Sequence, residues 1–287
     1  MDRLSSFSKI FLIFVWLMLG VGSAFAAWDG SIATTAPRDT SIGGKTYYLI
    51  DSEAKLAWFS VFVNQNKNNS AKANAKLMAD LDMGGELWTP ICAGTGGNKD
   101  GKTYCQYQGT FDGNGHVIKN LYINGDGLAQ KDKNFAQNLG FIGVLGSGTV
   151  KNLILENVDI HATTSIGSLL GADNQISVGS FVGWMADVDN NVVEKCMVTG
   201  SIRTTGNGQG VGGIVGNAKK GTISDCLSLV EIMTSGSQAY VGGIIGIIKS
   251  KNFVRSPFSL NTSSLIAYIN LILFLPLLLI ASALLRS

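Results

Sequence analysis

Seven charged side chains in the second half of the chain could carry acid–base chemistry on a polysaccharide. Lyase and hydrolase reactions need carboxylates gathered on one exposed face, or a basic residue beside carboxylate-bound calcium. The candidates are Asp159, Asp187, Asp189, Lys195, Arg203, Asp225 and Glu231. They lie in different turns and strands and recur at no common position, which is typical of solvated surface. We therefore expect no catalytic residues, and a polysaccharide lyase or hydrolase is the alternative.

Known catalytic and ligand-binding motifs are missing from the sequence. The stretch from Phe111 to His116 contains Asp-Gly and Asn-Gly pairs, which are turn formers, and it lacks the further acidic ligands of a calcium loop. The sequence also has no HExxH zinc motif, no GxSxG nucleophile elbow and no phosphate-binding loop. We expect neither a cofactor nor a metal.

Two cysteines and three tryptophans have expected structural or binding roles. Cys92 and Cys105 flank a polar loop, and a disulfide there would stabilise an exported protein by roughly 3 kcal/mol. Zinc is not expected, because the cysteines lack paired CxxC spacing. Trp58 and Trp88 should pack in the N-terminal region, whereas Trp184 is a candidate carbohydrate contact.

Internal repeats dominate the sequence. A glycine-hydrophobic unit occurs four times, and its last glycines are Gly143, Gly183, Gly216 and Gly246. These glycines are 40, 33 and 30 residues apart. No unit shows the roughly 3.6-residue period of a helix, so each is expected to form a strand.

A second, β-branched element lies between the glycine units and bends at a small polar residue or a cysteine. We assign the bend residues to one repeat position: Asn120, Asn152, Cys196 and Cys226. Such a side chain can satisfy backbone groups left unpaired at an inward bend. Two states are open for the cysteines. We favour buried thiols, because stacked parallel side chains do not readily reach disulfide torsions, and an inter-coil disulfide is the alternative.

One repeat of this kind cannot bury its apolar face, so neighbouring copies must stack with their strands in parallel, about 4.8 Å apart. The sequence thus predicts an all-β fold. We expect a right-handed parallel β-helix (solenoid) with a short N-terminal helical cap and a C-terminal hydrophobic helix. In the cap, Ser52 should begin a helix with Leu56, Phe59 and Val63 on one face, and residues 77–83 should form one strand.

The N-terminal half resembles a known repeat family. The series ADLDM (79–83), WTPI (88–91) and GTFDGNGHVIKNL (109–121) is similar to the entry coil of GLUG-repeat proteins, which are β-solenoid surface and adhesin-like proteins of bacteria. The later GFIG and GGIVG units resemble their repeats, so the likeness covers residues 47–248. It implies attachment or scaffolding by association only. The chain departs from the family pattern after residue 248, where no further repeat follows.

Both ends of the chain carry apolar segments. The N-terminal one is typical of a secretory signal cleaved between Ala26 and Ala27, with an uncleaved membrane anchor as the alternative. Residues 265–285 are long enough to span a membrane, but their flanking charges reverse the usual bias. Two interpretations of this segment remain: a membrane anchor, and a truncated or frame-shifted tail. The expected order is signal peptide (1–26), linker (27–44), capping region (45–108), GLUG-like repeats (109–248), linker (249–264) and hydrophobic segment (265–285).

The composition of the chain limits the classes of binding partner that we expect. The 287 residues carry a net charge of +2, so we expect no nucleic acid, and 36 glycines against 4 prolines indicate ordered β-structure. We expect an exported, non-enzymatic adhesion or structural module at the cell surface or outer envelope. Its partner would be a surface polysaccharide or a surface protein of a host or neighbouring cell. The remaining alternative is a truncated remnant of a larger adhesin.

Overall fold

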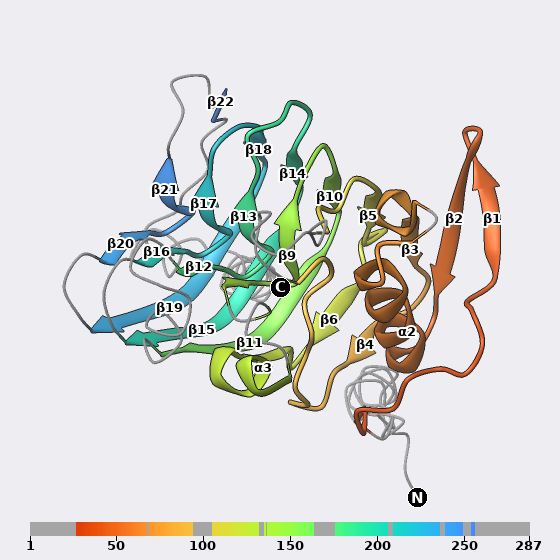
Figure 1. Cartoon of the computed structure of the whole chain (residues 1–287), viewed down its shortest axis with the longest axis horizontal. Helices are drawn as coiled ribbons and strands as arrows, with labels where there is room; N and C mark the ends of the chain where they lie inside the picture. Colours follow the sequence, from red (N-terminus) through yellow and green to blue (C-terminus); the bar gives the residue numbers. More distant parts are fainter. Residues whose placement is uncertain are drawn as a thin grey trace, which may run out of the picture.

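The fold is a set of stacked, mostly parallel β-sheets (Figure 1). The computed structural model describes residues 27–67, 69–93, 105–131, 135, 137–163, 176–205, 209–235, 239–248 and 254–255. Within these ranges the strands form four sheets of 8, 6, 4 and 4 strands.

The first sheet runs through both the N-terminal region and the repeats. Its strands, in spatial order, are β1 (Asp39–Ile42), β2 (Lys45–Ile50), β3 (Asn74–Leu77), β5 (Thr110–Asp112), β10 (Thr149–Lys151), β14 (Val192–Glu194), β18 (Thr222–Ser224) and β22 (Val254–Arg255). β1 and β2 pair antiparallel, and the later neighbours pair in parallel. The turn between β1 and β2 has Gly43 and Gly44 at φ values of +56° and +76°, which glycine adopts without strain.

The second sheet carries the longest strands. It contains β4 (Leu81–Asp82), β6 (Val117–Lys119), β7 (Tyr122–Asn124), β11 (Ile154–Ala162), β15 (Met197–Thr205) and β19 (Leu227–Ser235). β11 pairs with both β6 and β7, and its register with β15 shifts between Leu155 and Val158. This bulge lets one long strand continue past two short ones.

The third and fourth sheets are built by the glycine units. The third contains β8 (Asn138–Leu139), β12 (Ile176–Gly179), β16 (Gln209–Gly212) and β20 (Ala239–Gly242). The fourth contains β9 (Ile142–Leu145), β13 (Val182–Met185), β17 (Val215–Ala218) and β21 (Ile245–Ile248). The flanking strand pairs place Gly143, Gly183, Gly216 and Gly246 at one register position.

The prediction of a single right-handed β-helix with a C-terminal hydrophobic helix is wrong. The described strands form four sheets, of 8, 6, 4 and 4 strands, with an antiparallel pair at one edge of the largest, rather than one closed solenoid. The physical reason is that the segments before Asn138 contribute strands only to the first two sheets. The predicted helix over 265–285 lies outside the described residues. Within the described part, no helix is long and apolar enough to cross a bilayer.

In the part of the chain that the structure describes, two α-helices and a short 3-10 helix accompany the sheets. The helix expected after Ser52 is α2 (Glu53–Asn64), and it buries Leu56, Phe59 and Val63 as its pattern indicates. Ser52 makes no side-chain capping bond, whereas the Glu53 carboxylate accepts a hydrogen bond from the Asp82 backbone N–H at 2.9 Å. The other two helices are η1 (Ser70–Lys72) and α3 (Gly125–Lys131), neither of which was expected. The strand expected over 77–83 is split between β3 and β4.

The N-terminal region and the repeats share one hydrophobic core. Trp88 is only 1% exposed, its ring stacks on Phe141 at 5.6 Å, and Phe141 in turn meets the edge of Phe111 at 4.8 Å. Trp58 stacks on Phe62 at 5.0 Å. Both tryptophans therefore pack within the fold. The continuous core indicates that α2 and the stacked strands fold together.

We expect the protein to lose stability at alkaline pH because of Tyr107. Its hydroxyl donates to the Ala73 carbonyl at 2.9 Å, and complete burial raises the pKa of the phenol well above its ordinary value of 10.0. Above that value the unfolded chain releases the proton while the folded chain retains it, so the free energy of unfolding falls as pH rises. Urea unfolding between pH 8 and pH 11 should show this fall, and Tyr107→Phe should flatten it. If the free energy of unfolding fell equally with pH in both proteins, the role given to Tyr107 would be contradicted.

Candidate functional site

A groove lined by several polar side chains lies beside the second sheet, and we call it the Tyr122 groove. Its volume is about 480 Å³. The residues that line it are Ala27, Asp82, Gly84, Gly85, Asn120, Tyr122, Asn157 and Asp159. Ala27 lies in the N-terminal segment, and the others come from β4, β7, β11 and the turns that follow β4 and β6. The parallel pairing of these strands therefore brings together positions far apart in sequence.

A row of hydrogen-bonded side chains crosses the groove. Asn157 Nδ2 donates to Asn120 Oδ1 at 2.7 Å, and Asn120 Nδ2 donates to Asp82 Oδ1 at 2.8 Å. Both asparagines have left-handed backbone angles, with φ of +53° at Asn120 and +56° at Asn157. Asparagine tolerates this conformation better than most residues do. The row is therefore held by both the backbone and the amide network.

Beside this row, three donors converge on one carboxylate. Asp159 Oδ1 lies 2.8 Å from His161 Nε2 and 3.1 Å from the Arg203 guanidinium, and the Ser201 hydroxyl donates to the same oxygen at 3.3 Å. Asp159 and His161 project from β11, and the other two residues project from β15. The His161 ring meets Tyr122 edge-on at 6.0 Å. This cluster extends the polar surface from the groove along the sheet.

The other charged candidates are dispersed. Asp189 pairs with Lys220 at 2.6 Å, and the hydrogen bond from this lysine to Asp189 raises the pKa of Lys220. Lys195 and Asp225 occupy equivalent bends, whereas Glu231 stacks in register with Ser201 beside the cluster. Asp187 is exposed. The structure thus brings Asp159 and Arg203 together and leaves Asp187 and Asp189 apart from them.

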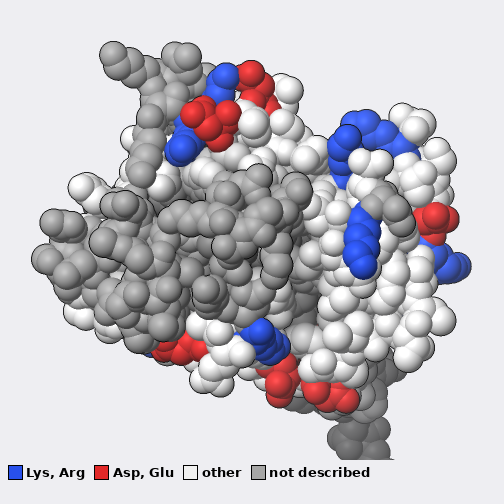
Figure 2. Space-filling model, in the orientation of Figure 1, with Lys and Arg blue, Asp and Glu red and all other residues white. Residues whose placement is uncertain are grey.

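Figure 2 shows lysine and arginine beside aspartate or glutamate in some places on the visible face, and without an acidic neighbour in others. Among the described residues, no group of three or more His, Cys, Asp or Glu side chains could hold a metal ion.

Trp184, the tryptophan considered for carbohydrate contact, is half-buried on β13. The Lys219 ammonium lies over its ring, 5.5 Å from the centroid. This cation covers part of the surface that a sugar would need.

The predicted disulfide between Cys92 and Cys105 is confirmed. Their Cα atoms are 4.8 Å apart. Residues near each cysteine form isolated bridges to β9, from Ile91 to Ile142 and from Tyr107 to Leu145. The disulfide therefore holds together two segments that meet the same strand.

The four bend residues do not share one register position, which corrects their alignment. Asn152 is opposite Lys195, because the preceding residues pair as Lys151↔Glu194, and Asn120 is opposite Asn157. These positions have left-handed backbone angles, and the cysteines come one residue after such a position. The physical cause of the misalignment is that the bends of β6 and β10 belong to different sheets.

Cys196 and Cys226 are stacked, free and buried. Each thiol bonds to a backbone carbonyl two residues before it, Glu194 at 3.2 Å and Ser224 at 3.1 Å. Burial raises the pKa of Cys196, whereas the hydrogen bond from Cys196 lowers the pKa of Cys226. They contribute to the interior of the stack rather than to the groove.

Sequence reasoning missed the groove itself. The sequence pattern does not link Tyr122, Asn157 and Ser201 to a common site. One available signal was the Asp-x-His spacing of Asp159 and His161, which places both side chains on one face of a strand. Asn157 gave no such signal, because its position depends on the bulge in β11.

Comparison with known proteins gives one local similarity. No protein-family model matches the chain, and no solved structure matches it. Over 119 residues the chain is 30% identical to Halomucin of Haloquadratum walsbyi (strain DSM 16790 / HBSQ001). The aligned part is 41% of this chain but only 1% of that protein. The resemblance to GLUG-repeat proteins thus stays a prediction, and the chain is similar to a short part of Halomucin.

Proposed function

We propose that this chain is an exported, non-catalytic surface module that contacts a polysaccharide through the Tyr122 groove. The Cys92–Cys105 disulfide supports export, because such bonds persist mainly outside the reducing cytosol. The local similarity to Halomucin, by its name a mucin, agrees with a surface or secreted protein.

The hydrogen-bonded row through the groove carries the proposal. Asp82, Asn120 and Asn157 offer amide donors and carboxylate or amide acceptors in a fixed order. Adjacent strands lie about 4.8 Å apart, so these groups form a regular line rather than a single point. Tyr122 adds an aromatic ring with a polar hydroxyl. Sugar chains present the same alternation of hydroxyls and apolar C–H faces.

The geometry of Asp159 favours contact over catalysis. A general acid or base needs a carboxyl oxygen that can exchange a proton with substrate. Asp159 Oδ1 is already in hydrogen-bond contact with three side chains, those of His161, Arg203 and Ser201. These donors hold the carboxylate as part of the surface.

Tyr122→Ala tests the groove, and Tyr240→Ala is its matched control. Tyr240 is 54% exposed on β20 and contributes nothing to the groove. In affinity electrophoresis through gels containing pectate, alginate or xylan, we expect Tyr122→Ala to weaken retention by about tenfold, which is the loss of roughly 1.4 kcal/mol. Tyr240→Ala should bind like the parent. Unchanged retention of Tyr122→Ala, or equal loss in both variants, would contradict the proposal.

A polysaccharide-active enzyme is the second candidate, because Asp159, His161 and Arg203 do share one face. Dye release from labelled polysaccharides distinguishes the two functions. Turnover by the parent that disappears in Asp159→Asn would establish the enzyme and overturn the non-catalytic module.

A further inference from the structure

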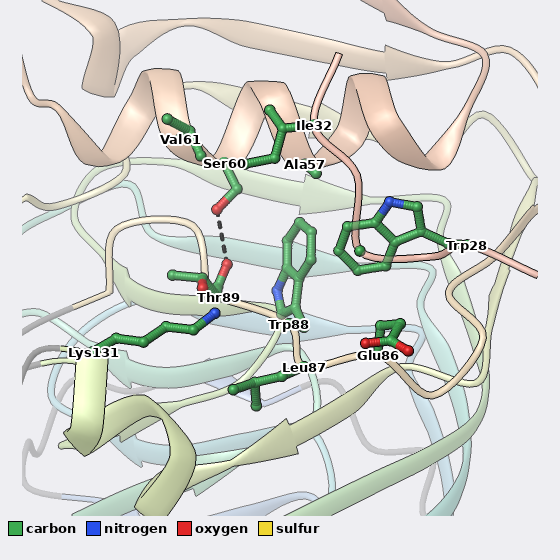
Figure 3. A pocket seen from close by; sticks show the side chains of 11 residues that line it. Trp28, Ile32, Ala57, Ser60, Val61, Glu86, Leu87, Trp88, Thr89 and Lys131 are labelled. Atoms are coloured by element: carbon green, nitrogen blue, oxygen red, sulfur yellow. Dashed lines mark hydrogen bonds between the residues drawn. The ribbon is translucent and has the colours of Figure 1, made fainter. Parts of the chain in front are cut away.

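A second hollow lies directly beside the Tyr122 groove, and we call it the Trp28 pocket (Figure 3). Its volume is about 260 Å³. The residues that line it are Trp28, Gly30, Ile32, Ala57, Ser60, Val61, Glu86, Leu87, Trp88, Thr89 and Lys131. Ala27 and Gly85 line the groove, and their chain neighbours Trp28 and Glu86 line the pocket. The two hollows therefore share one wall.

Two indole N–H groups and a serine hydroxyl in the pocket wall already donate hydrogen bonds to backbone carbonyls. Trp28 Nε1 donates to the Ser31 carbonyl at 2.7 Å, and Trp88 Nε1 donates to the Phe141 carbonyl at 3.1 Å. The Ser60 hydroxyl donates to the Thr89 carbonyl at 2.8 Å, as the dashed line in Figure 3 shows. These bonds fix both indole rings, but Trp88 is almost fully buried and Trp28 is only half-buried, so the ring that a ligand can reach is that of Trp28.

Two opposite charges on the rim have no partner in the described part of the chain. Neither the Glu86 carboxylate nor the Lys131 ammonium forms a hydrogen bond or an ion pair there. Both residues are exposed, and Figure 3 places them on opposite sides of Leu87. A ligand between them could meet an acceptor at one end and a cation at the other.

We propose that the Trp28 pocket binds a single acidic sugar ring, a uronic acid unit of a polysaccharide. The C–H face of the ring packs on Trp28, sugar hydroxyls donate to Glu86, and the sugar carboxylate accepts from Lys131. The volume suits one ring, because pockets for drug-sized ligands start at about 300 Å³. The inference rests on the proposed polysaccharide contact for its ligand class, but it uses residues outside the Tyr122 groove.

The test compares three methyl glycosides on the full chain: the glucuronoside, the neutral glucoside and the glucosaminide. Calorimetry should show the glucuronoside binding at least about tenfold more tightly than the glucoside, because a charge-assisted hydrogen bond is added. Lys131→Met should remove this preference, and Lys45→Met, an exposed lysine on β2, should preserve it. Lys131 has no partner to lose within the described chain, so its replacement should leave the unfolding midpoint unchanged.

Three outcomes would overturn the inference: no binding of the glucuronoside, equal or tighter binding of the other glycosides, or a preference that survives Lys131→Met. Tyr122→Ala separates this inference from the proposed function. If that variant loses polysaccharide retention while the glucuronoside fails to bind, the inference fails and the groove function stands. If the glucuronoside binds with the expected preference but Tyr122→Ala retains polysaccharide, the groove function fails and the pocket stands.

Discussion

Gly216→Val is expected to lower the free energy of unfolding by about 3 kcal/mol. A Cβ at Gly216 would meet the backbone N of Val178 in β12, and it would lie 2.8 Å from the Gly183 carbonyl oxygen. These atoms belong to hydrogen-bonded strands and cannot rotate away as a flexible side chain can. The valine must therefore push neighbouring strands apart. Urea unfolding followed by circular dichroism measures the loss.

Gly243→Val is the matched control. Gly243 lies in the last described glycine unit, where a Cβ would have no atom within 4 Å. We expect its free energy of unfolding to change by no more than about 0.5 kcal/mol. Equal losses in the two variants would show that valine is disfavoured by the local backbone rather than by strand stacking. That result would contradict the close approach of β17 to β12.

Replacing both Cys92 and Cys105 by serine should cost about 3 kcal/mol of stability. The cysteines are 13 residues apart, and the flanking residues Ile91 and Tyr107 both bridge to β9. Without the crosslink the unfolded chain gains conformational freedom, and these contacts must form without it.

The reducing agent dithiothreitol provides the control for this pair. It should lower the unfolding midpoint of the parent protein to that of the double variant and leave the variant unchanged. Cys196 and Cys226 are free thiols, so the agent has no second bond to break. An unaffected parent, or a further fall in the variant, would contradict the role of the disulfide.

Part of the fold could be predicted from the sequence because local pattern determined it. The spacing of the repeat glycines predicted stacked parallel strands, and the one-sided pattern of Leu56, Phe59 and Val63 predicted α2. The division into four sheets could not be predicted in this way. It depends on which strands the N-terminal region adds, and its strands join only two sheets.

Other elements were missed for identifiable reasons. The sequence of α3, GDGLAQK, contains two glycines and lacks a helical pattern, and burial of Leu128 supplies its tertiary support. The β1–β2 hairpin did have a signal, since Gly43-Gly44 is a suitable pair for a two-residue turn.

The candidate sites depended more strongly on tertiary structure. Asn120 and Asn157 are 37 positions apart, and they meet only because β6 pairs with β11. Trp28 and Lys131 share a pocket although no repeat links them. The sequence shows which residue types are present, but these residues lie close together only because their strands pair.

The most direct test of the proposed function measures binding and cleavage on the same sample. The purified protein is incubated with pectate, alginate or xylan, and both retained protein and newly formed chain ends are quantified. The account predicts retention on at least one polysaccharide, dependence on Tyr122, and no increase in chain ends. Steady release of chain ends, or no retention on any of them, would contradict a non-catalytic module that contacts polysaccharide.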